Sequence, residues 1–276
     1  MDSEIHHVTD TALMVAAARA IETSREGALI NDPFAARLAG ERGLALASAR
    51  GGEWMRIGVS IRTHFIDEVV GDALAADGIN TVVNFGAGLD TRPWRMDLPG
   101  TLRWIEIDFE SILNYKLEIL ANETPNCAHM PLSADLTRAG DRERVYAAIG
   151  REPALMITEG LLMYLPADAV RALAAEAPTD TGIRWWLFDI ASAALMRVAH
   201  SQGLDQIGKV RPQDHLTGNE IADAAAQTGW RLRRRLTYMS EMARVMAHAI
   251  APMPEISAPT SAPPADDPSG VYLYAR

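Results

Sequence analysis

The sequence predicts an α/β protein built on one mostly parallel sheet. Beyond residue 79, short apolar runs rich in Val, Ile, Leu and Trp alternate with segments of helical periodicity. This alternation is typical of buried parallel strands joined by covering helices. The chain has 276 residues, of which 48% are hydrophobic, and no Pro- or Gly-rich linker divides its interior. One large domain is therefore expected.

The apolar pattern places each element of this sheet. The expected parallel strands are Thr81 to Phe85, Leu102 to Ile107, His129 to Ser133, Ala154 to Thr158 and Trp185 to Asp189. Amphipathic helices are expected before the sheet, at Asp10 to Arg25 and Glu53 to Ala76. Near the end of the chain, β-prone runs at Trp230 to Tyr238 and Val271 to Tyr274 predict an antiparallel edge pair. Between them, a Pro/Ser/Ala-rich segment at 253–270 predicts a mobile loop.

Charge and composition disfavour several partner classes. The chain has 36 acidic and 26 basic residues, a formal net charge of −10, which disfavours binding to nucleic acid. The basic cluster at Arg231, Arg233, Arg234 and Arg235 is explained by solvated charges that alternate along a strand. The single Cys127 and the lack of clustered Cys and His predict no metal site. No signal-peptide or membrane-span pattern is found, so a cytoplasmic protein without membrane contact is expected.

The first expected strand runs directly into a tight glycine turn, Gly86-Ala87-Gly88. Glycine lets the backbone turn sharply and approach a ligand closely, because it has no Cβ. The second expected strand is followed by Asp108, twenty-two residues after Gly86. In a doubly wound sheet these two strands are neighbours, so the carboxylate can accept both hydroxyls of a ribose beside the turn.

This arrangement suits NAD as well as S-adenosylmethionine. A dinucleotide site normally has a third glycine, which brings a helix N-terminus close to the pyrophosphate. Here Thr91 stands at that position. The substitution favours S-adenosylmethionine, while a nicotinamide-dependent dehydrogenase is kept as the less favoured alternative.

Several motifs resemble the leucine carboxyl methyltransferase family, and within it the bacterial branch of tetracenomycin-type polyketide carboxyl O-methyltransferases. They lie at Thr11–Ala16, Asn31–Ala35, Arg62–Asp67, Gly86–Arg92 and Glu159–Leu165. The resemblance covers most of the chain up to about Trp230 and weakens beyond it. It implies a Rossmann-like class I methyltransferase fold whose N-terminal helices, with Thr11 and Arg19, form a lid over the cofactor.

The resemblance also assigns roles to individual residues. Arg62 would pair with the methionine carboxylate of S-adenosylmethionine, and Glu159 would accept from its ammonium group. Asp108 would hold the ribose, while Asp135 and Leu136 would receive the adenine. The implied cofactor-binding residues are Arg62, Gly86, Gly88, Asp108, Asp135, Leu136 and Glu159.

The resemblance also implies a division of the chain and a candidate residue at the acceptor, and the sequence departs from the family at one position. Residues 1–78 would form the lid, 79–238 the cofactor-binding core, and 239–276 a C-terminal helix, the loop and the last strand of one methyltransferase domain. Tyr164 follows the fourth strand and is a candidate to face the methyl acceptor. Asn84 departs from many methyltransferases, which have an acid two residues before the first glycine.

The implied reaction is methyl transfer to an oxygen of a small molecule, a carboxylate or a phenol, in secondary metabolism. A carboxylate is already ionised at neutral pH and needs no base, whereas a phenol benefits from one. His64, His200 and His215 are the candidate bases. A protein that binds S-adenosylmethionine without catalysis is a further alternative, and a homodimer is left open.

Overall fold

A computed structural model describes residues 8–48, 52–201, 212–238 and 267–276. It contains one seven-stranded sheet in the order β3-β2-β1-β4-β5-β7-β6. Its strands are β1 (Thr81–Phe85), β2 (Arg103–Asp108), β3 (Ala128–Ser133), β4 (Ala154–Thr158), β5 (Ile183–Ile190), β6 (Arg231–Thr237) and β7 (Gly270–Ala275). The first five pair in parallel, whereas β7 is antiparallel to β5 and to β6. The predicted fold class and the antiparallel edge pair are confirmed.

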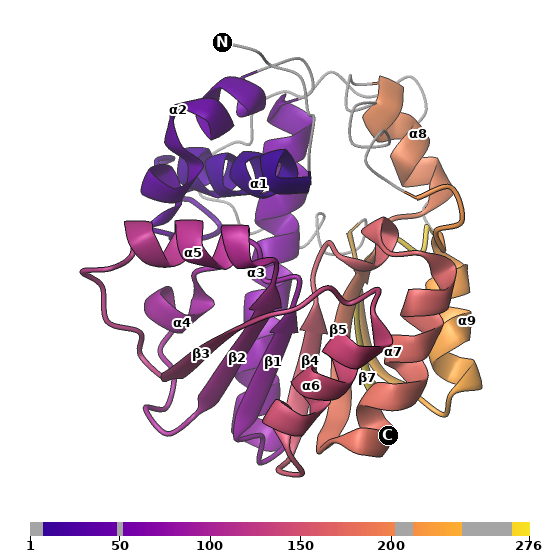
Figure 1. Ribbon diagram of the computed structural model, residues 1–276. Coiled ribbons are helices and arrows are strands. Elements are labelled where there is room, and N and C mark those ends of the chain that lie inside the picture. Colours follow the sequence, from indigo (N-terminus) through magenta and orange to yellow (C-terminus); the bar gives the residue numbers. More distant parts are fainter. Residues whose placement is uncertain (1–7, 49–51, 202–211, 239–266) are drawn as a thin grey trace.

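Helices cover both faces of the sheet and its upper edge (Figure 1). They are α1 (Val8–Thr23), α2 (Ala35–Ala47), α3 (Gly52–Ala76), α4 (Arg92–Arg95), α5 (Glu110–Ile119), α6 (Ala139–Ile149), α7 (Ala167–Asp180), α8 (Ala193–Ser201) and α9 (Asn219–Gln227), together with the 3-10 turn η1 (Leu162–Tyr164). Residues of α6, α7 and α9 pack on one sheet face, and residues of α3 pack on the other. The sheet thus separates two apolar core layers, one on each of its faces.

The central strands β1 and β4 are buried along their whole length. Their residues are mostly apolar, with Thr81, Asn84 and Thr158 as buried polar exceptions, because both faces of a parallel strand are covered by helices. They lie side by side although they are far apart in sequence, so the strand order reverses between them. Such a reversal opens a crevice at the carboxyl ends of the strands, where ligands of doubly wound proteins bind.

Helices α1 and α2 lie above one half of the upper sheet edge, and α8 lies above the other half (Figure 1). The close approach of α1 and α2 depends on Gly43, because a Cβ there would lie 2.7 Å from the carbonyl oxygen of Leu13. The sequence predicted α1 and α3 closely but did not predict α2. The N-terminal helices therefore occupy the lid position that the family resemblance implies.

The arginine-rich strand β6 follows the predicted alternation only in part, because most of its arginines are exposed and Leu236 is buried, but Leu232 is 51% exposed. A bulge between Leu232 and Arg234 shifts this alternation by one residue. It turns Arg234 toward α3, where the guanidinium pairs with Glu68 and with Asp72 at 2.6 Å. The basic cluster is thus partly an internal contact.

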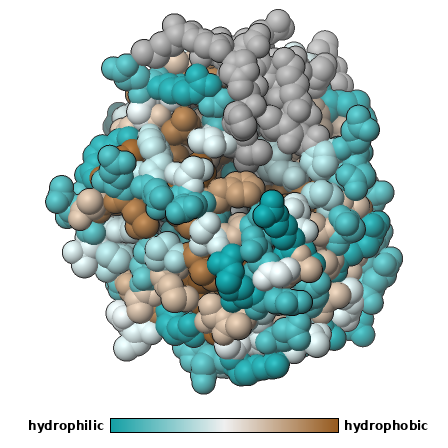
Figure 2. Space-filling view, viewed as in Figure 1, coloured by the Kyte–Doolittle hydropathy of each residue, from teal (hydrophilic) through white to brown (hydrophobic). Residues whose placement is uncertain are grey.

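The expected C-terminal helix and nearly all of the expected loop at 253–270 lie outside the described residues. None of the helices in the described ranges is long and apolar enough to cross a membrane. Figure 2 shows hydrophilic side chains over most of one face, with hydrophobic ones in small separate patches.

A buried ion pair lies beneath the glycine turn. The Nζ of Lys116 on α5 is 2.7 Å from Oε2 of Glu106 on β2, and both side chains are completely buried. His129 on β3 contacts the same carboxylate oxygen through Nε2 at 2.9 Å. Lys116 also donates to the carbonyl oxygen of Asp90 at 3.3 Å, so it joins the sheet to the loop after β1.

We predict that Lys116→Ala lowers the free energy of unfolding by about 3 to 5 kcal/mol, because it leaves the Glu106 carboxylate buried without its cation. The matched control is Arg37→Ala, which breaks the exposed Arg37–Glu123 pair (2.6 Å) and should lose about 1 kcal/mol or less. Urea unfolding of both variants measures the difference. Similar losses for the two would contradict a buried charge in need of its partner.

Candidate functional site

A cavity of about 350 Å³ lies at the carboxyl ends of the strands, where the strand order reverses. Its volume is in the range of sites for small ligands and cofactors. The loops after β1, β2 and β4 contribute to its wall, together with α1, α3 and α8. The cavity is therefore enclosed partly by the sheet edge and partly by the N-terminal helices.

The predicted glycine turn forms one wall of this cavity. Gly86 and Gly88 have φ angles of 66° and 49°, in the left-handed region that favours glycine. The amides of Gly86 and Ala87 donate to the carbonyl oxygen of Ile107 at 2.8 and 3.1 Å, which holds the turn against β2. A Cβ on Gly86 would lie 2.7 Å from Cδ1 of Leu161. The loop thus has the tight left-handed geometry predicted for a glycine turn, and its approach to a ligand stays a prediction.

Asp108 lies at the end of β2 and lines the cavity beside this turn. One carboxylate oxygen accepts from the amide of Gly88 at 2.7 Å, and the other from the amide of Phe109 at 2.7 Å. Burial raises the pKa of Asp108 in spite of these two hydrogen bonds. Because each oxygen has further lone pairs, the carboxylate can still accept from a ligand.

Two apolar side chains that sequence analysis did not single out lie next to Asp108. Phe109 is 51% exposed although it is a large hydrophobic residue, and it lines the cavity. Ile112, one turn along α5, lines it as well. The ring of Phe109 and the side chain of Ile112 lie beside the Asp108 carboxylate and form a surface that suits a flat, apolar ring. The position of Phe109 directly after the strand-end acid is the signal that could have revealed it.

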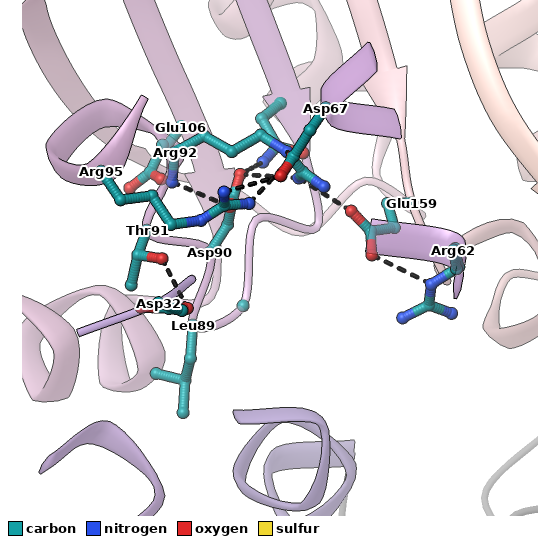
Figure 3. A network of polar contacts seen from close by, with 12 residues as sticks. Asp32, Arg62, Asp67, Leu89, Asp90, Thr91, Arg92, Arg95, Glu106 and Glu159 are labelled. Carbon is teal, nitrogen blue, oxygen red and sulfur yellow. Dashed lines mark hydrogen bonds and ion pairs between the residues drawn. The ribbon is translucent and has the colours of Figure 1, made fainter. Parts of the chain in front are cut away.

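Glu159, which follows β4, lies between two arginines (Figure 3). Its Oε1 accepts from Nε of Arg62 at 2.9 Å, and its Oε2 accepts from a terminal nitrogen of Arg92 at 2.8 Å. Burial works to raise the pKa of Glu159, but the charges of Arg92 and Arg62 hold it below its ordinary value. The carboxylate is therefore ionised and already neutralised within the protein.

Arg92 connects this carboxylate to two further acids. Its Nε donates to Asp67 on α3 at 2.6 Å, and a terminal nitrogen contacts Asp90 at 3.2 Å. Arg95 pairs with the same Asp67 at 2.6 Å (Figure 3). Burial works to raise the pKa of Asp90, but Arg92, Arg95 and Lys116 bring it down to about 2. Arg62, Asp67, Asp90, Arg92 and Arg95 thus form one ion-pair network with Glu159.

Asp189 near the end of β5 extends this network, and sequence analysis did not select it. Its Oδ1 accepts from the amide of Gly160 at 2.6 Å, and its Oδ2 is 3.4 Å from a terminal nitrogen of Arg62. Burial raises the pKa of Asp189 in spite of the nearby arginine. Because the acid closes an expected strand, as Asp108 does, its sequence position could have revealed it.

The departure at Asn84 has a structural explanation. Its Nδ2 donates to Oδ2 of Asp90 at 2.8 Å, and both residues line the cavity. The acid that many methyltransferases place before the glycine turn is therefore replaced here by an amide that contacts an acid after the turn.

The structure does not bring Asp135 and Leu136 to the cavity wall. The Asp135 carboxylate accepts from the amide and hydroxyl of Thr137 at 3.0 and 2.7 Å, so it closes its own turn. Leu136 packs in the core beside α6 and α7. Neither belongs to the residues that line the cavity. Their proposed contact with adenine stays a prediction.

The other predicted residues divide into two groups. Tyr164, Thr11 and Arg19 line the cavity, and Arg19 also ties the lid to the core by donating to the carbonyl oxygen of Leu89 at 2.6 Å. His64 does not line it, since its ring lies against Phe65 with centroids 5.6 Å apart. His215 lies in a neighbouring chamber, and the side chain of His200 lies outside the described residues.

Taken together, the reversed strand order, the glycine turn and the acid after β2 define a Rossmann-like protein with a ligand cavity at its switch point. The chain belongs to the leucine carboxyl methyltransferase family, whose model matches residues 12–177.

Curated relatives agree with this family. The chain is 39% identical over 179 residues to a protein of Streptomyces avermitilis named "Putative S-adenosyl-L-methionine-dependent methyltransferase", and the match covers 60% of this chain and 62% of that protein. A Mycobacterium bovis protein of the same name is 37% identical over 192 residues, covering 60% of this chain and 54% of the relative. The matches thus span less than two thirds of these relatives.

Solved structures confirm the fold. A DUF574 family protein of Streptomyces avermitilis superposes with a TM-score of 0.57 at 15% identity, covering 95% of this chain and 96% of its own. A protein of Thermobifida fusca described as a methyltransferase gives a TM-score of 0.55 at 15% identity, with 96% and 94% covered. The architecture is that of class I methyltransferases.

We predict opposite effects for two Gly→Ala substitutions. Gly86→Ala should lower the free energy of unfolding by about 1 to 2 kcal/mol, because alanine resists a left-handed conformation and its Cβ would press on Leu161. Gly71→Ala, on α3 with no atom within 4 Å of the added Cβ, should instead raise it by about 0.4 to 1 kcal/mol. Urea unfolding measures both, and a gain at Gly86 would refute the strained turn.

Proposed function

We propose that the cavity binds S-adenosylmethionine and that the protein transfers its methyl group to an oxygen of a small molecule. The observation that carries the proposal is Asp108, a half-buried carboxylate held beside a left-handed glycine turn at the switch point. Its free lone pairs suit the two ribose hydroxyls. The family membership and the names of the relatives support the same ligand.

The adenosyl part fits the wall formed by the loop after β2. With the ribose on Asp108, the adenine ring would contact Phe109 and Ile112, which line the same side of the cavity. A flat ring placed against an aromatic and an aliphatic side chain gains apolar burial. Asp135 and Leu136 do not line the cavity, so they would contact the adenine only if the bound ligand extended beyond the residues that form the cavity wall.

The methionine part fits the ion-pair network on the opposite side. The network joins three arginines and four acids, Asp67, Asp90, Glu159 and Asp189, so it has one acid in excess. S-adenosylmethionine has an ammonium, a sulfonium and a carboxylate, so it has one positive charge in excess. The hydrogen bonds of Arg62 to Glu159 and Asp189 use Nε and one terminal nitrogen. Its remaining N–H groups can donate to the ligand carboxylate.

A dinucleotide fits this site less well. The helix after the glycine turn, α4, has only four residues, so it presents little helix dipole to a pyrophosphate. Thr91, which replaces the third glycine, is completely buried and donates to Asp32 at 2.7 Å. Its side chain thus ties the turn to the lid instead of leaving room for a phosphate.

When bound, S-adenosylmethionine supplies a methyl group that its sulfonium has already activated. The protein would position the acceptor oxygen in line and exclude water. Helices α1 and α3 contribute apolar residues such as Ala12, Val15 and Ile61 to the wall, which suits this exclusion. We propose that the acceptor is a carboxylate or a phenol. We also propose that the reaction belongs to secondary metabolism in the cytoplasm. The oligomeric state, with a homodimer as one option, is left to measurement.

We predict that Asp108→Asn weakens binding of S-adenosylhomocysteine by roughly 10- to 100-fold, because a charge-assisted hydrogen bond contributes about 1.5 to 3 kcal/mol. Calorimetry measures the affinity. Asp135→Asn is the matched comparison, and its loss should be smaller because its carboxylate lies outside the cavity wall. Unchanged affinity in Asp108→Asn would overturn the cofactor assignment.

The pH dependence of methyl transfer distinguishes the two acceptor classes. A carboxylate acceptor is ionised from about pH 6 upward, because carboxyl groups have pKa values near 4. The single-turnover rate with such an acceptor should be nearly constant between pH 6 and 9. A screen of carboxylates and phenols for methyl esters and ethers by mass spectrometry supplies the acceptor.

A rate that rises about tenfold over this range would indicate a phenol or alcohol, whose proton must leave before or during the transfer. His215→Gln and His64→Gln then identify the base, because only His215 lies in the chamber next to the cavity. Loss of the rise in His64→Gln alone would contradict this placement. Absence of any methylated product would favour the alternative of a binding protein without catalysis.

A further inference from the structure

A second chamber of about 580 Å³ adjoins the cofactor cavity. It lies between η1, the start of α8 and the residues that precede α9. Six residues line both spaces, namely Gly160, Leu161, Met163, Asp189, Ala191 and Met196. The two spaces therefore share a wall, and a molecule in the chamber would lie next to a ligand in the cavity.

Most of the chamber wall is apolar. Leu162, Leu216 and Ile221 are buried behind it, and Met163 and Met196 are half-buried on the shared side. Methionine side chains are flexible and polarizable, so they adapt to ligands of different outline. A wall of this kind suits the hydrocarbon or aromatic body of a small molecule.

Two basic side chains interrupt this apolar wall. Arg197 on α8 lines the chamber but not the cofactor cavity, and among the described residues it forms no ion pair or hydrogen bond. Most arginines near the cavity are paired, as Arg19, Arg62, Arg92 and Arg95 show. Within the described part of the chain, Arg197 is thus a cation at an apolar site without a neutralising acid beside it.

His215 is the second basic side chain of the chamber, and a hydrogen bond fixes which of its ring nitrogens carries the proton. Its Nδ1 lies 2.6 Å from the carbonyl oxygen of Pro212, so Nδ1 carries the proton and donates it there. Nε2 is then the ring nitrogen left for a ligand. The imidazole can accept from a hydroxyl when neutral, or donate to an anion when protonated.

The charged groups on the walls of the two spaces favour one orientation of a molecule bound in the chamber. Asp189 on the shared wall belongs to the network that has one acid in excess. Arg197 lies only on the chamber side. A molecule with one anionic end gains most when that end lies at Arg197 and its other end faces Asp189 and the cofactor.

We propose that this chamber binds the methyl acceptor, and that the acceptor is an apolar small molecule with an anionic group remote from the oxygen that is methylated. The anionic group pairs with Arg197, while the apolar body fills the space between η1 and α9. Arg197 thus selects and orients the acceptor without touching the reacting oxygen. The identification of the ligand as the methyl acceptor rests on the proposed function, whereas the existence of the binding site does not.

The test uses 2-naphthoate and its neutral analogue 2-naphthamide as probes on the full chain saturated with S-adenosylhomocysteine. Fluorescence titration at pH 8 measures both affinities. We expect the wild type to prefer 2-naphthoate at least fivefold. Arg197→Gln should weaken 2-naphthoate about 5- to 20-fold and leave 2-naphthamide unchanged. Arg233→Gln, an exposed arginine on β6 away from the chamber, is the matched control and should keep the preference.

A second variant tests the location of the site. Ala193→Phe places a large ring in the chamber from an exposed first position of α8, so folding should tolerate it. It should weaken both probes about tenfold. Absence of probe binding in the wild type, a preference that survives Arg197→Gln, or unchanged binding in Ala193→Phe would each overturn the proposal.

The two proposals can fail separately. Affinity for S-adenosylhomocysteine, measured alone in every variant, reports on the cofactor cavity. Loss of the naphthoate preference with unchanged S-adenosylhomocysteine binding in Arg197→Gln supports the chamber alone. If S-adenosylhomocysteine does not bind at all, the proposed function fails, and the probe titration without it still tests the Arg197 site.

Discussion

The Arg92 guanidinium is the interaction on which the rest of the site depends. It is 1% exposed and contacts acids that reach it from three directions, Asp67 on α3, Asp90 after β1 and Glu159 after β4. Removal of one partner from a buried ion pair is strongly destabilising, because the remaining charge keeps its desolvation penalty. Arg92 therefore holds the helix, the glycine turn and the central strand ends in one fixed arrangement.

This network also explains why the family motifs lie where they do in the sequence. Arg62 and Asp67 belong to one motif, Arg92 to a second and Glu159 to a third, and they meet as ion pairs. The motif at residues 31–35 joins the same region, because Asp32 accepts from Arg19 on α1 and from Thr91. Motifs that are separate along the chain thus form one polar layer between the sheet edge and the lid.

A rigid layer of paired charges suits the chemistry proposed for the cavity. Fixed charges in a site that excludes water act more strongly on a ligand than mobile ones, and they need no reorganisation when charge shifts. The layer lies on one side of the cavity, while apolar residues of the lid and the neighbouring chamber cover the others. The ionic part of the ligand and the apolar body of an acceptor are thereby given separate environments.

Patterns along the chain predict the strands, their parallel pairing, the glycine turn and the position of Asp108 beside that turn. These features depend on local periodicity and on spacing between neighbouring strands, both of which can be read along the chain. Only the tertiary structure decided that Asp189 joins Arg62, that Asp135 lies off the cavity wall, and that Arg197 and His215 share a chamber. Those relations depend on how loops from distant segments converge above the sheet, and the packing of the whole chain determines that convergence.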